Sequence, residues 1–381
     1  MFVTISLYLI LLLNTVYSDT SERIYIKNLY GFSDHYVVNS DSNTNLQSYK
    51  LNLAMYDKSL CGINLYEDNA KEGDDKELSS KCHHKKVDVS KSMGGVDISI
   101  TSEPWSVQIY NLNKYVCGGT LVSRNYVMTA AHCIIENCYS WNVSQKTIRK
   151  FDVLINFPGD ETNNYLDKTL DGFQLPFIRR HIRSIILPSI SNDENVKCNG
   201  KNDFAIFELD KPVPEGYGYA CIPIYHPPMY TIYSSDFYVV GYGRNPYRER
   251  RMMLTQNKAL KNIFNQDNLL TYDRNKIQKL EVGVIFTFPG CRLKPSIPAD
   301  KGYICVYDKI DEGICDGDSG SGLFKKHKDI NSNLTEQAYI VGVVSKAVPC
   351  SEGRDWVTTN YQLYTDVFQQ SPIYEKLFSE E

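Results

Sequence analysis

Residues 315–322, with the sequence CDGDSGSG, place a serine in a glycine-rich stretch suited to nucleophilic catalysis. The glycines permit a tight backbone bend, so the Ser319 hydroxyl can stand clear of the chain. In such a bend the backbone N–H groups of Gly317 and Ser319 can converge on one point and stabilise a developing oxyanion. A serine hydroxyl is a weak nucleophile, so this chemistry also needs a base and an acid that orients the base. Without those partners, the stretch would be an ordinary Gly/Ser surface turn.

Two further motifs contain the residue types that a serine nucleophile needs. His132 follows an apolar, strand-like run in YVMTAAHC, residues 126–133. Asp203 precedes another apolar run in NDFAIF, residues 202–207. A histidine that takes the serine proton and an aspartate that holds the histidine would complete a catalytic triad. The alternative for the three residues is a histidine packed in the core, an acid in a turn and a hydroxyl in a loop.

These motifs, in the chain order His, Asp, Ser, resemble those of the chymotrypsin-like (trypsin-like) serine proteases, and the resemblance covers residues 92–378. It implies an all-β fold of two six-stranded antiparallel β-barrels with a C-terminal helix. It also implies that Ser319 attacks a peptide carbonyl, with His132 as base and Asp203 as its partner. Neither a metal nor another cofactor is expected. The abundance of Tyr and Asn also resembles trypsin-like proteins of nematodes.

Length and charge limit the classes of function that the chain can have. Its 381 residues are enough for a large core and a second, smaller segment. The formal net charge of -4 gives no electrostatic basis for binding nucleic acid. Protein and peptide partners are therefore expected, and nucleic acids are not.

The N-terminus is predicted to be a secretory signal over residues 1–18. The apolar run from Ile5 to Leu13 is too short to span a bilayer, and Ser18 is small enough for cleavage before Asp19. A signal anchor is the alternative. No other segment is long and apolar enough to cross a membrane, so the protein is predicted to be secreted, without stable membrane insertion.

The cysteines and two short motifs fit an extracellular protein. Eleven cysteines are expected in an oxidising compartment, where disulfides persist. Asn142 and Asn333 each begin an N-x-S/T sequence, so both are predicted glycosylation acceptors.

Residues 19–91 are predicted to be a pro-segment or linker with little internal structure, followed by the protease domain over 92–381. Charge is dense over residues 67–86, which is typical of a solvated linker. A short helix is the expectation for residues 46–61. No strong hydrophobic periodicity is present between Asp19 and Lys91.

The junction with the protease domain resembles an activation site. Lys91 precedes Ser92-Met93-Gly94-Gly95, where the resembled family has Ile-Val-Gly-Gly after a basic residue. By that resemblance, an activating protease would cut between Lys91 and Ser92, and the new ammonium would pair with Asp318. Pairing stabilises a charge that is costly to bury alone. The alternative is that Lys91 is only a linker lysine and that the chain does not mature in this way.

Short β-rich runs predict the strands of the two barrels. In the first barrel they are Ser106–Tyr110, Gly119–Val122, Asn125–Thr129, Asp152–Asn156 and Phe204–Leu209. In the second they are Glu281–Phe288, Gly302–Tyr307, Gly322–Lys325, Tyr339–Ser345 and Tyr361–Val367. Surface insertions are expected over Gly172–Ile186 and Ser189–Asn202, an extra helix within Arg244–Lys279, and a terminal helix over Pro372–Phe378.

The resemblance also implies a disulfide pattern. Cys221 matches the position that ties a pro-segment to the catalytic domain, with Cys61 or Cys82 as its partner. A bond between Cys138 and Cys198 is plausible and would leave one pro-segment cysteine over. Three pairs are implied within the protease domain: Cys117–Cys133, Cys291–Cys305 and Cys315–Cys350.

The substrate pocket departs from the family pattern. Gly313 stands where trypsin-like members carry Asp, so a preference for Lys or Arg would lack its charge partner. Ser345 matches the family, but Lys346 and Ala347 replace Trp and Gly. Gln362 falls near a usual pocket glycine. Ala347 and Gln362 are therefore expected to narrow the pocket and to favour small or polar side chains.

The sequence as a whole predicts a secreted serine endopeptidase made as a zymogen and not trypsin-like in primary specificity. Its expected partners are protein or peptide substrates, protease inhibitors and an activating protease. The rival interpretation is a catalytically weak or inactive protease homologue that acts as a binding or regulatory protein. The substitutions at Ser92, Lys346 and Gln362 support that rival. An ester-cleaving enzyme would share the same chemistry.

Overall fold

The structure is a computed structural model of residues 1–381. The described ranges are 16–19, 23–26, 35–39, 61–63, 95–99, 102–135, 143–156, 177–188, 202–223, 237–243, 277–283, 285–286, 291–294, 297–298, 302–307, 313–327, 336–346 and 361–378. No helix within these ranges has the length and apolar character needed to cross a membrane.

Six strands form a closed antiparallel barrel, in the order β9-β10-β7-β6-β5-β8, with β8 pairing back to β9. The strands are β5 (Ser106–Asn111), β6 (Lys114–Leu121), β7 (Tyr126–Thr129), β8 (Phe151–Asn156), β9 (Phe177–Pro188) and β10 (Ala205–Leu209). A 3-10 turn, η2 (Ala131–Cys133), follows β7, and a short helix, α2 (Gln145–Ile148), precedes β8.

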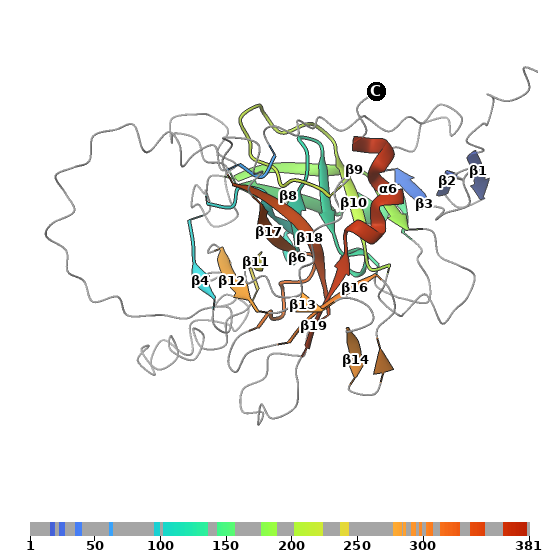
Figure 1. Cartoon of the computed structure of the whole chain (residues 1–381). Helices are drawn as coiled ribbons and strands as arrows, with labels where there is room; N and C mark the ends of the chain where they lie inside the picture. Colours follow the sequence, from blue (N-terminus) through green and yellow to red (C-terminus); the bar gives the residue numbers. More distant parts are fainter. Residues whose placement is uncertain are drawn as a thin grey trace, which may run out of the picture.

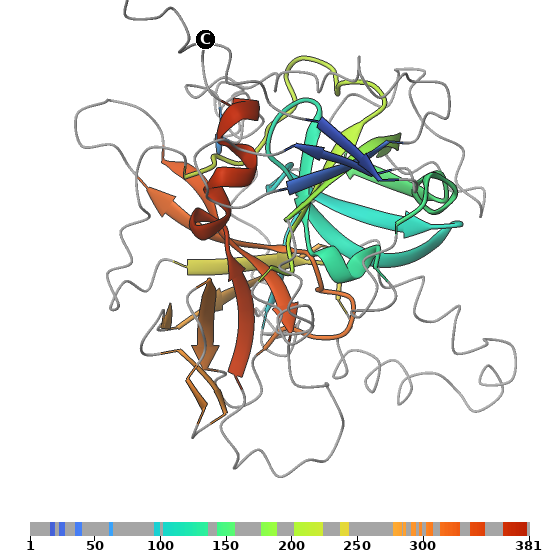
Figure 2. The same cartoon turned by 90° about the vertical axis from the view of Figure 1, so that its right-hand side faces the viewer.

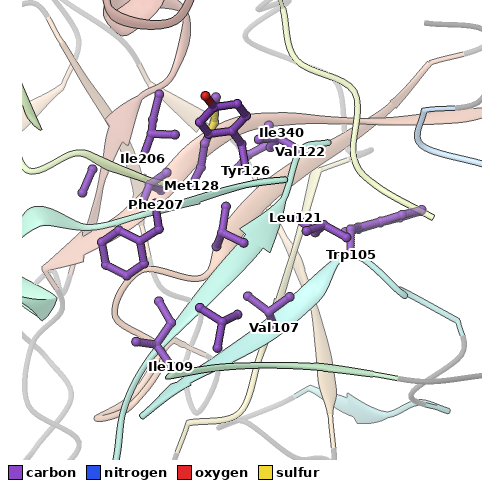
Figure 3. Close-up of a cluster of buried hydrophobic side chains, with 14 of the residues drawn as sticks. Trp105, Val107, Ile109, Leu121, Val122, Tyr126, Met128, Ile206, Phe207 and Ile340 are labelled. Carbon is purple, nitrogen blue, oxygen red and sulfur yellow. The ribbon is translucent and has the colours of Figure 1, made fainter. Parts of the chain in front are cut away.

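The interior of this barrel is filled by branched and aromatic side chains (Figure 3). Val107, Ile109, Met128 and Phe207 have no solvent-exposed surface. Burial of one large apolar side chain contributes about 1.5–3 kcal/mol, so this core strongly favours one strand register. The register places Ala205 opposite Thr129 across β10 and β7. The segment before β10 and the turn after β7 are thereby held next to each other.

The second half of the domain forms an eight-stranded sheet in the order β13-β16-β19-β18-β17-β11-β12-β4. Figure 2 shows this sheet beside the first barrel, with its later strands in orange and red. In the described residues no pairing closes the sheet between its outer strands. Its strands are β4 (Val96–Asp97), β11 (Phe237–Gly241), β12 (Gln278–Val282), β13 (Ile285–Phe286), β16 (Tyr303–Tyr307), β17 (Gly322–His327), β18 (Gln337–Lys346) and β19 (Tyr361–Asp366). A separate hairpin joins β14 (Arg292–Lys294) and β15 (Ile297–Pro298).

The predicted terminal helix is present as α6 (Ser371–Phe378), after the 3-10 turn η4 (Phe368–Gln370) (Figure 1). The helix begins one residue before Pro372, whose fixed φ and missing N–H are tolerated in a first helical turn. Tyr374 packs near Phe204, and Phe378 packs near Tyr126. The helix therefore covers the first barrel although it follows the last strand of the second sheet.

One predicted surface insertion is wrong in part. Residues from Phe177 onward lie in β9, where Ile182, Ile185 and Ile186 are buried. The arginines give this segment the polar composition of a surface loop, because only one face of the strand packs against the core. The other expected insertion, 189–202, lies outside the described residues except for Asn202.

The expectation of little internal structure over residues 19–91 is also wrong in part, because two strands lie within it. Three strands, β1 (Val16–Asp19), β2 (Arg23–Ile26) and β3 (His35–Asn39), extend the first sheet from β9. β3 supplies backbone partners to Ser184–Pro188 of β9. The helix expected within 46–61 lies outside the described residues apart from Cys61. The helix expected within 244–279 also lies outside them up to residue 276, and residues 278–279 belong to β12.

Candidate active site

His132 lies in η2, at the point where the chain leaves β7. Cys133, the next residue, forms a disulfide with Cys117 of β6, and Thr129 donates a hydrogen bond from Oγ1 to the Gly118 carbonyl at 2.9 Å. These two links hold the turn against β6. The His132 side chain remains 41% exposed, which leaves the imidazole open to a substrate.

Asp203 lies two residues before the start of β10 and contacts His132 through both of its carboxylate oxygens. The backbone N–H of His132 donates to Oδ1 at 2.8 Å, and Nδ1 of the imidazole lies 2.7 Å from Oδ2. The Asp203 side chain is 8% exposed, so the contact is screened from solvent on the acid's side. This arrangement fixes both the position of the imidazole and the nitrogen that carries its proton.

Two residues of the second sheet complete the surroundings of Asp203. Ser345 of β18 donates from Oγ to Oδ2 at 2.6 Å, and Thr365 of β19 donates from Oγ1 to the Asp203 carbonyl at 2.9 Å. Ser345 was predicted as a substrate-pocket residue, and its hydroxyl contacts the acid. Thr365 was missed by the sequence analysis, because its spacing from Asp203 carries no signal. The site is thus built across the seam between the two halves.

The electrostatics of the pair favour the charged form of both partners. Burial raises the pKa of Asp203. The charge and hydrogen bonds of His132 together lower it by more than burial raises it, so the pKa of Asp203 lies below its ordinary value. Burial lowers the pKa of His132, whereas the Asp203 carboxylate raises it more, so the net pKa is raised. The ammonium of Lys346 opposes that rise. An imidazolium formed beside Asp203 is therefore stabilised.

The Ser319 loop is held against both halves by backbone hydrogen bonds. Gly118 of β6 donates its N–H to the Ser319 carbonyl at 2.8 Å, and Gly320 donates to the Val344 carbonyl of β18 at 2.9 Å. Gly320 has a φ of 78°, and a Cβ there would collide with Thr129 Oγ1 and the Gly118 carbonyl. The loop therefore lies against the elements that position His132. Among the described residues, no hydrogen bond joins the Ser319 hydroxyl to the His132 ring.

Asp318 points away from the solvent and is 2% exposed. Its Oδ1 accepts the Gly243 N–H and its Oδ2 accepts the Cys315 N–H, each at 2.8 Å. Burial raises the pKa of Asp318 to about 6, against which these two hydrogen bonds act. No cationic side chain of the described ranges forms an ion pair with Asp318. The loop thus contains a buried carboxyl group whose charge has not been compensated by a cation.

The predicted pocket residues are only partly described. Gln362 of β19 is 2% exposed, and its Oε1 accepts a hydrogen bond from the Tyr364 hydroxyl. Gly313 is buried and begins the segment that leads to the Ser319 loop. β18 and β19 are paired neighbours, which places Gln362 on the strand beside Ser345. Ala347 lies outside the described residues.

The disulfides link the site to its scaffold and to the segment around Cys61. The structure pairs Cys117 with Cys133 and Cys291 with Cys305, as the resemblance implied. It also pairs Cys221 with Cys61, which selects one of the two expected partners. Cys315 is disulfide-bonded. Several residues of the expected sites lie outside the described ranges: Lys91, Ser92, Cys82, Cys138, Cys198, Cys350, Asn142 and Asn333.

One group of possible metal ligands lies at the site. Ligand atoms of Cys117, His132 and Cys133 are within 4.8 Å of one another. Both sulfurs belong to the same disulfide, so neither is available as the thiolate that metals require. This group does not form a metal-binding donor set.

The closed barrel, the neighbouring sheet and the short terminal helix define a chymotrypsin-like fold. A family model described as Trypsin matches residues 92–372. Because this match covers well over half of the chain, the chain belongs to the trypsin family of serine proteases.

Sequence identity to individual relatives ranges from 25% to 46%, over alignments of very different lengths. Phenoloxidase-activating factor 3 of Holotrichia diomphalia is 25% identical over 296 residues, which cover 74% of this chain and 72% of that protein. Kallikrein 1-related peptidase b3 of Mus musculus is 29% identical over 125 residues, 32% of this chain and 41% of the relative. Kallikrein 1-related peptidase b11 of Mus musculus is 46% identical over 52 residues, 14% of this chain and 20% of the relative. The chain thus spans less than half the length of these two kallikrein relatives.

Proposed function

We propose that the chain is a secreted serine endopeptidase that hydrolyses peptide bonds through an acyl-enzyme. The observation that carries this proposal is the double contact of Asp203 with His132, at 2.7 and 2.8 Å, in a turn whose imidazole is still exposed. A histidine that merely packed in a core would be buried and would need no fixed tautomer. The trypsin family match supports the same chemistry.

In the proposed reaction Ser319 is the nucleophile. Its Oγ attacks the scissile carbonyl carbon while His132 accepts the hydroxyl proton at Nε2. Asp203 stabilises the resulting imidazolium, and the backbone N–H groups of Gly317 and Ser319 bind the oxyanion. His132 then donates the proton to the leaving amine, and the acyl-enzyme forms. A water molecule attacks that ester by the same steps, which releases the acid and restores the serine.

The proposal includes synthesis as a zymogen. Asp318 is a buried carboxyl group held only by backbone N–H donors among the described residues, and this favours a later cationic partner. Cleavage between Lys91 and Ser92 by an activating protease would create an ammonium of that kind. Formation of the ion pair would offset the cost of burying the Asp318 charge and adjust the Ser319 loop.

The proposed primary specificity is for small or polar side chains. Gly313 brings no carboxylate to the pocket, and the buried carboxamide of Gln362 occupies space on the neighbouring strand. The protein would be secreted, with residues 1–18 as the signal peptide and with Asn142 and Asn333 as glycosylation acceptors. Protein substrates and protease inhibitors are the proposed partners.

A covalent probe tests this function directly. Purified chain cut at Lys91 should react with a fluorophosphonate, and Ser319→Ala should abolish the label. Asp316→Ala, in the same loop, serves as a control that keeps the nucleophile. Absence of labelling in folded, correctly cut protein would contradict the proposal and leave the inactive, binding homologue as the better interpretation.

A further inference from the structure

The Ser319 loop has a contact that the catalytic proposal does not use. Tyr115 of β6 donates from its hydroxyl to the carbonyl oxygen of Gly317 at 2.6 Å. Tyr115 is 6% exposed, so the bond is largely shielded from competing water. It connects the first barrel with the residue whose N–H is proposed to bind the oxyanion.

The ring of Tyr115 is itself held in place. It meets the ring of Tyr110 edge-on, with 5.7 Å between centroids and 82° between planes. The Tyr110 hydroxyl donates to Gln108 Oε1 at 2.8 Å. A rigidly packed ring can place its hydroxyl at one point with little loss of side-chain entropy on bonding.

Gly317 lies between the two halves of the molecule. A Cβ at this position would lie 3.3 Å from Cε1 of Tyr115 and 3.4 Å from Cα of Gly243. Gly317 has a φ of 96°, a conformation that glycine adopts readily but does not strongly prefer over others. Without outside contacts, the peptide groups on either side of Gly317 would be free to rotate. The orientation of this residue must therefore come from its neighbours.

The neighbours fix the peptide group between Gly317 and Asp318 at both ends. Tyr115 binds its carbonyl oxygen, and the Asp318 N–H of the same peptide donates to the Cys315 carbonyl at 3.0 Å. With this peptide fixed, the position of the Gly317 Cα is fixed too. The direction of the Gly317 N–H then depends only on the two backbone dihedral angles of Gly317 itself, φ and ψ.

We infer that Tyr115 is a positioning residue for the oxyanion site, acting through the Gly317 carbonyl. The inference rests on the proposed function, because it assigns a purpose to the same loop. Tyr115 touches neither the substrate nor the reacting atoms. Its hydroxyl keeps the Gly317 N–H aimed at the oxyanion, so its loss should reduce transition-state stabilisation more than substrate binding.

The test is Tyr115→Phe in the chain cut at Lys91, with Tyr110→Phe as the matched control. Removal of an oxyanion donor outright costs about 10²–10³ in kcat, so loss of a residue that only orients the donor should cost about 10-fold. The rate of fluorophosphonate labelling should fall by the same factor. KM and the acid limb of the pH profile should stay unchanged, because His132 and Asp203 are untouched. A fluorinated tyrosine at position 115 keeps the hydroxyl and should restore kcat.

Two results would overturn the inference: a kcat within about two-fold of the unmodified chain for Tyr115→Phe, or an equal loss for Tyr110→Phe. Complete inactivity of the unmodified cut chain would instead contradict the proposed function. In that case a crystal structure of Tyr115→Phe still decides the inference. The Gly317 carbonyl should turn from its place in the parent structure, and an unchanged orientation would overturn the positioning role.

Discussion

The carboxylate of Asp203 holds His132 by two atoms at once, the backbone N–H at 2.8 Å and the imidazole Nδ1 at 2.7 Å. Because one contact fixes the turn and the other fixes the ring, the aspartate sets both the place and the tautomer of the proposed base. An amide at position 203 would keep the shape but offer an N–H where an acceptor is needed.

Asp203→Asn should therefore lower kcat by about 10⁴, since the imidazole would carry its proton on the wrong nitrogen. Asp152→Asn is the matched control, because Asp152 binds His181 Nδ1 at 2.5 Å on the surface of the same barrel. Steady-state kinetics of the cut chain give the measurement. An equal loss in both variants would indicate damage to the barrel and would contradict the assigned role.

Lys346 should influence the pH at which the enzyme becomes active. The proposed activity requires neutral His132, and the raised pKa of His132 should place the acid limb of kcat/KM at a higher pH than an ordinary histidine would. The Lys346 ammonium lowers that pKa, so Lys346→Gln should shift the limb to higher pH. The shift should shrink in high salt, which screens exposed charges. Lys114→Gln is the control, and a shift toward lower pH for Lys346→Gln would contradict the assignment.

Asp318 should make the uncut chain less stable as the pH rises. Its pKa is raised by burial from 3.8 to about 6, so the folded chain binds the proton more tightly than the unfolded chain. The contribution of Asp318 to the free energy of unfolding is fully present below pH 3.8 and is lost as the pH rises through about 6. The free energy of unfolding should fall by about 3 kcal/mol over this range.

Cleavage at Lys91 should reverse that trend, because a new ammonium would lower the pKa of Asp318. Thermal unfolding of Ser319→Ala, which does not digest itself, can be compared before and after the cut between pH 4 and 7. We expect the cut form to gain stability relative to the uncut form as the pH rises. Parallel curves would show that no cation reaches Asp318.

Gln362 should limit the size of the substrate side chain on the acyl side of the cleaved bond. Gln362→Gly should raise kcat/KM for larger side chains by about 10-fold, and adding Gly313→Asp should create a preference for Lys and Arg. Tyr364→Phe removes the hydrogen bond to Gln362 but leaves the Gln362 side chain, and therefore its volume, in place. The preference for the size of the substrate side chain should then not change. A peptide library measures all three. Strong preference of the unmodified enzyme for Lys or Arg would refute the pocket assignment.

The pro-segment should stay attached after cleavage at Lys91. Cys61 is bonded to Cys221, and Gly62 forms backbone hydrogen bonds with Tyr219 at 2.6 Å and Ala338 at 2.9 Å. Denaturing gels should show two fragments only after reduction. Cys61→Ser should release the fragment without a reductant, and its retention would mean that another disulfide carries the link.

The sequence was most informative where function depends on local chemistry. A serine between glycines, a histidine after an apolar run and an acid before another are short patterns, and each is set by the few residues around it. The strand after Asp203 and the terminal helix could be predicted for the same reason, since the apolar periodicity of one segment decides them. β9 could not, because its arginines hide a core-facing row of isoleucines.

Tertiary structure alone decided which distant residues meet. Ser345 and Thr365 bond Asp203, and Tyr115 bonds Gly317, because the two halves pack across a seam. The choice of Cys61 as the partner of Cys221 has the same origin. Sequence specifies residue types and local backbone preferences, but contacts between segments far apart arise from the packing of whole sheets. No local pattern along the chain records that packing.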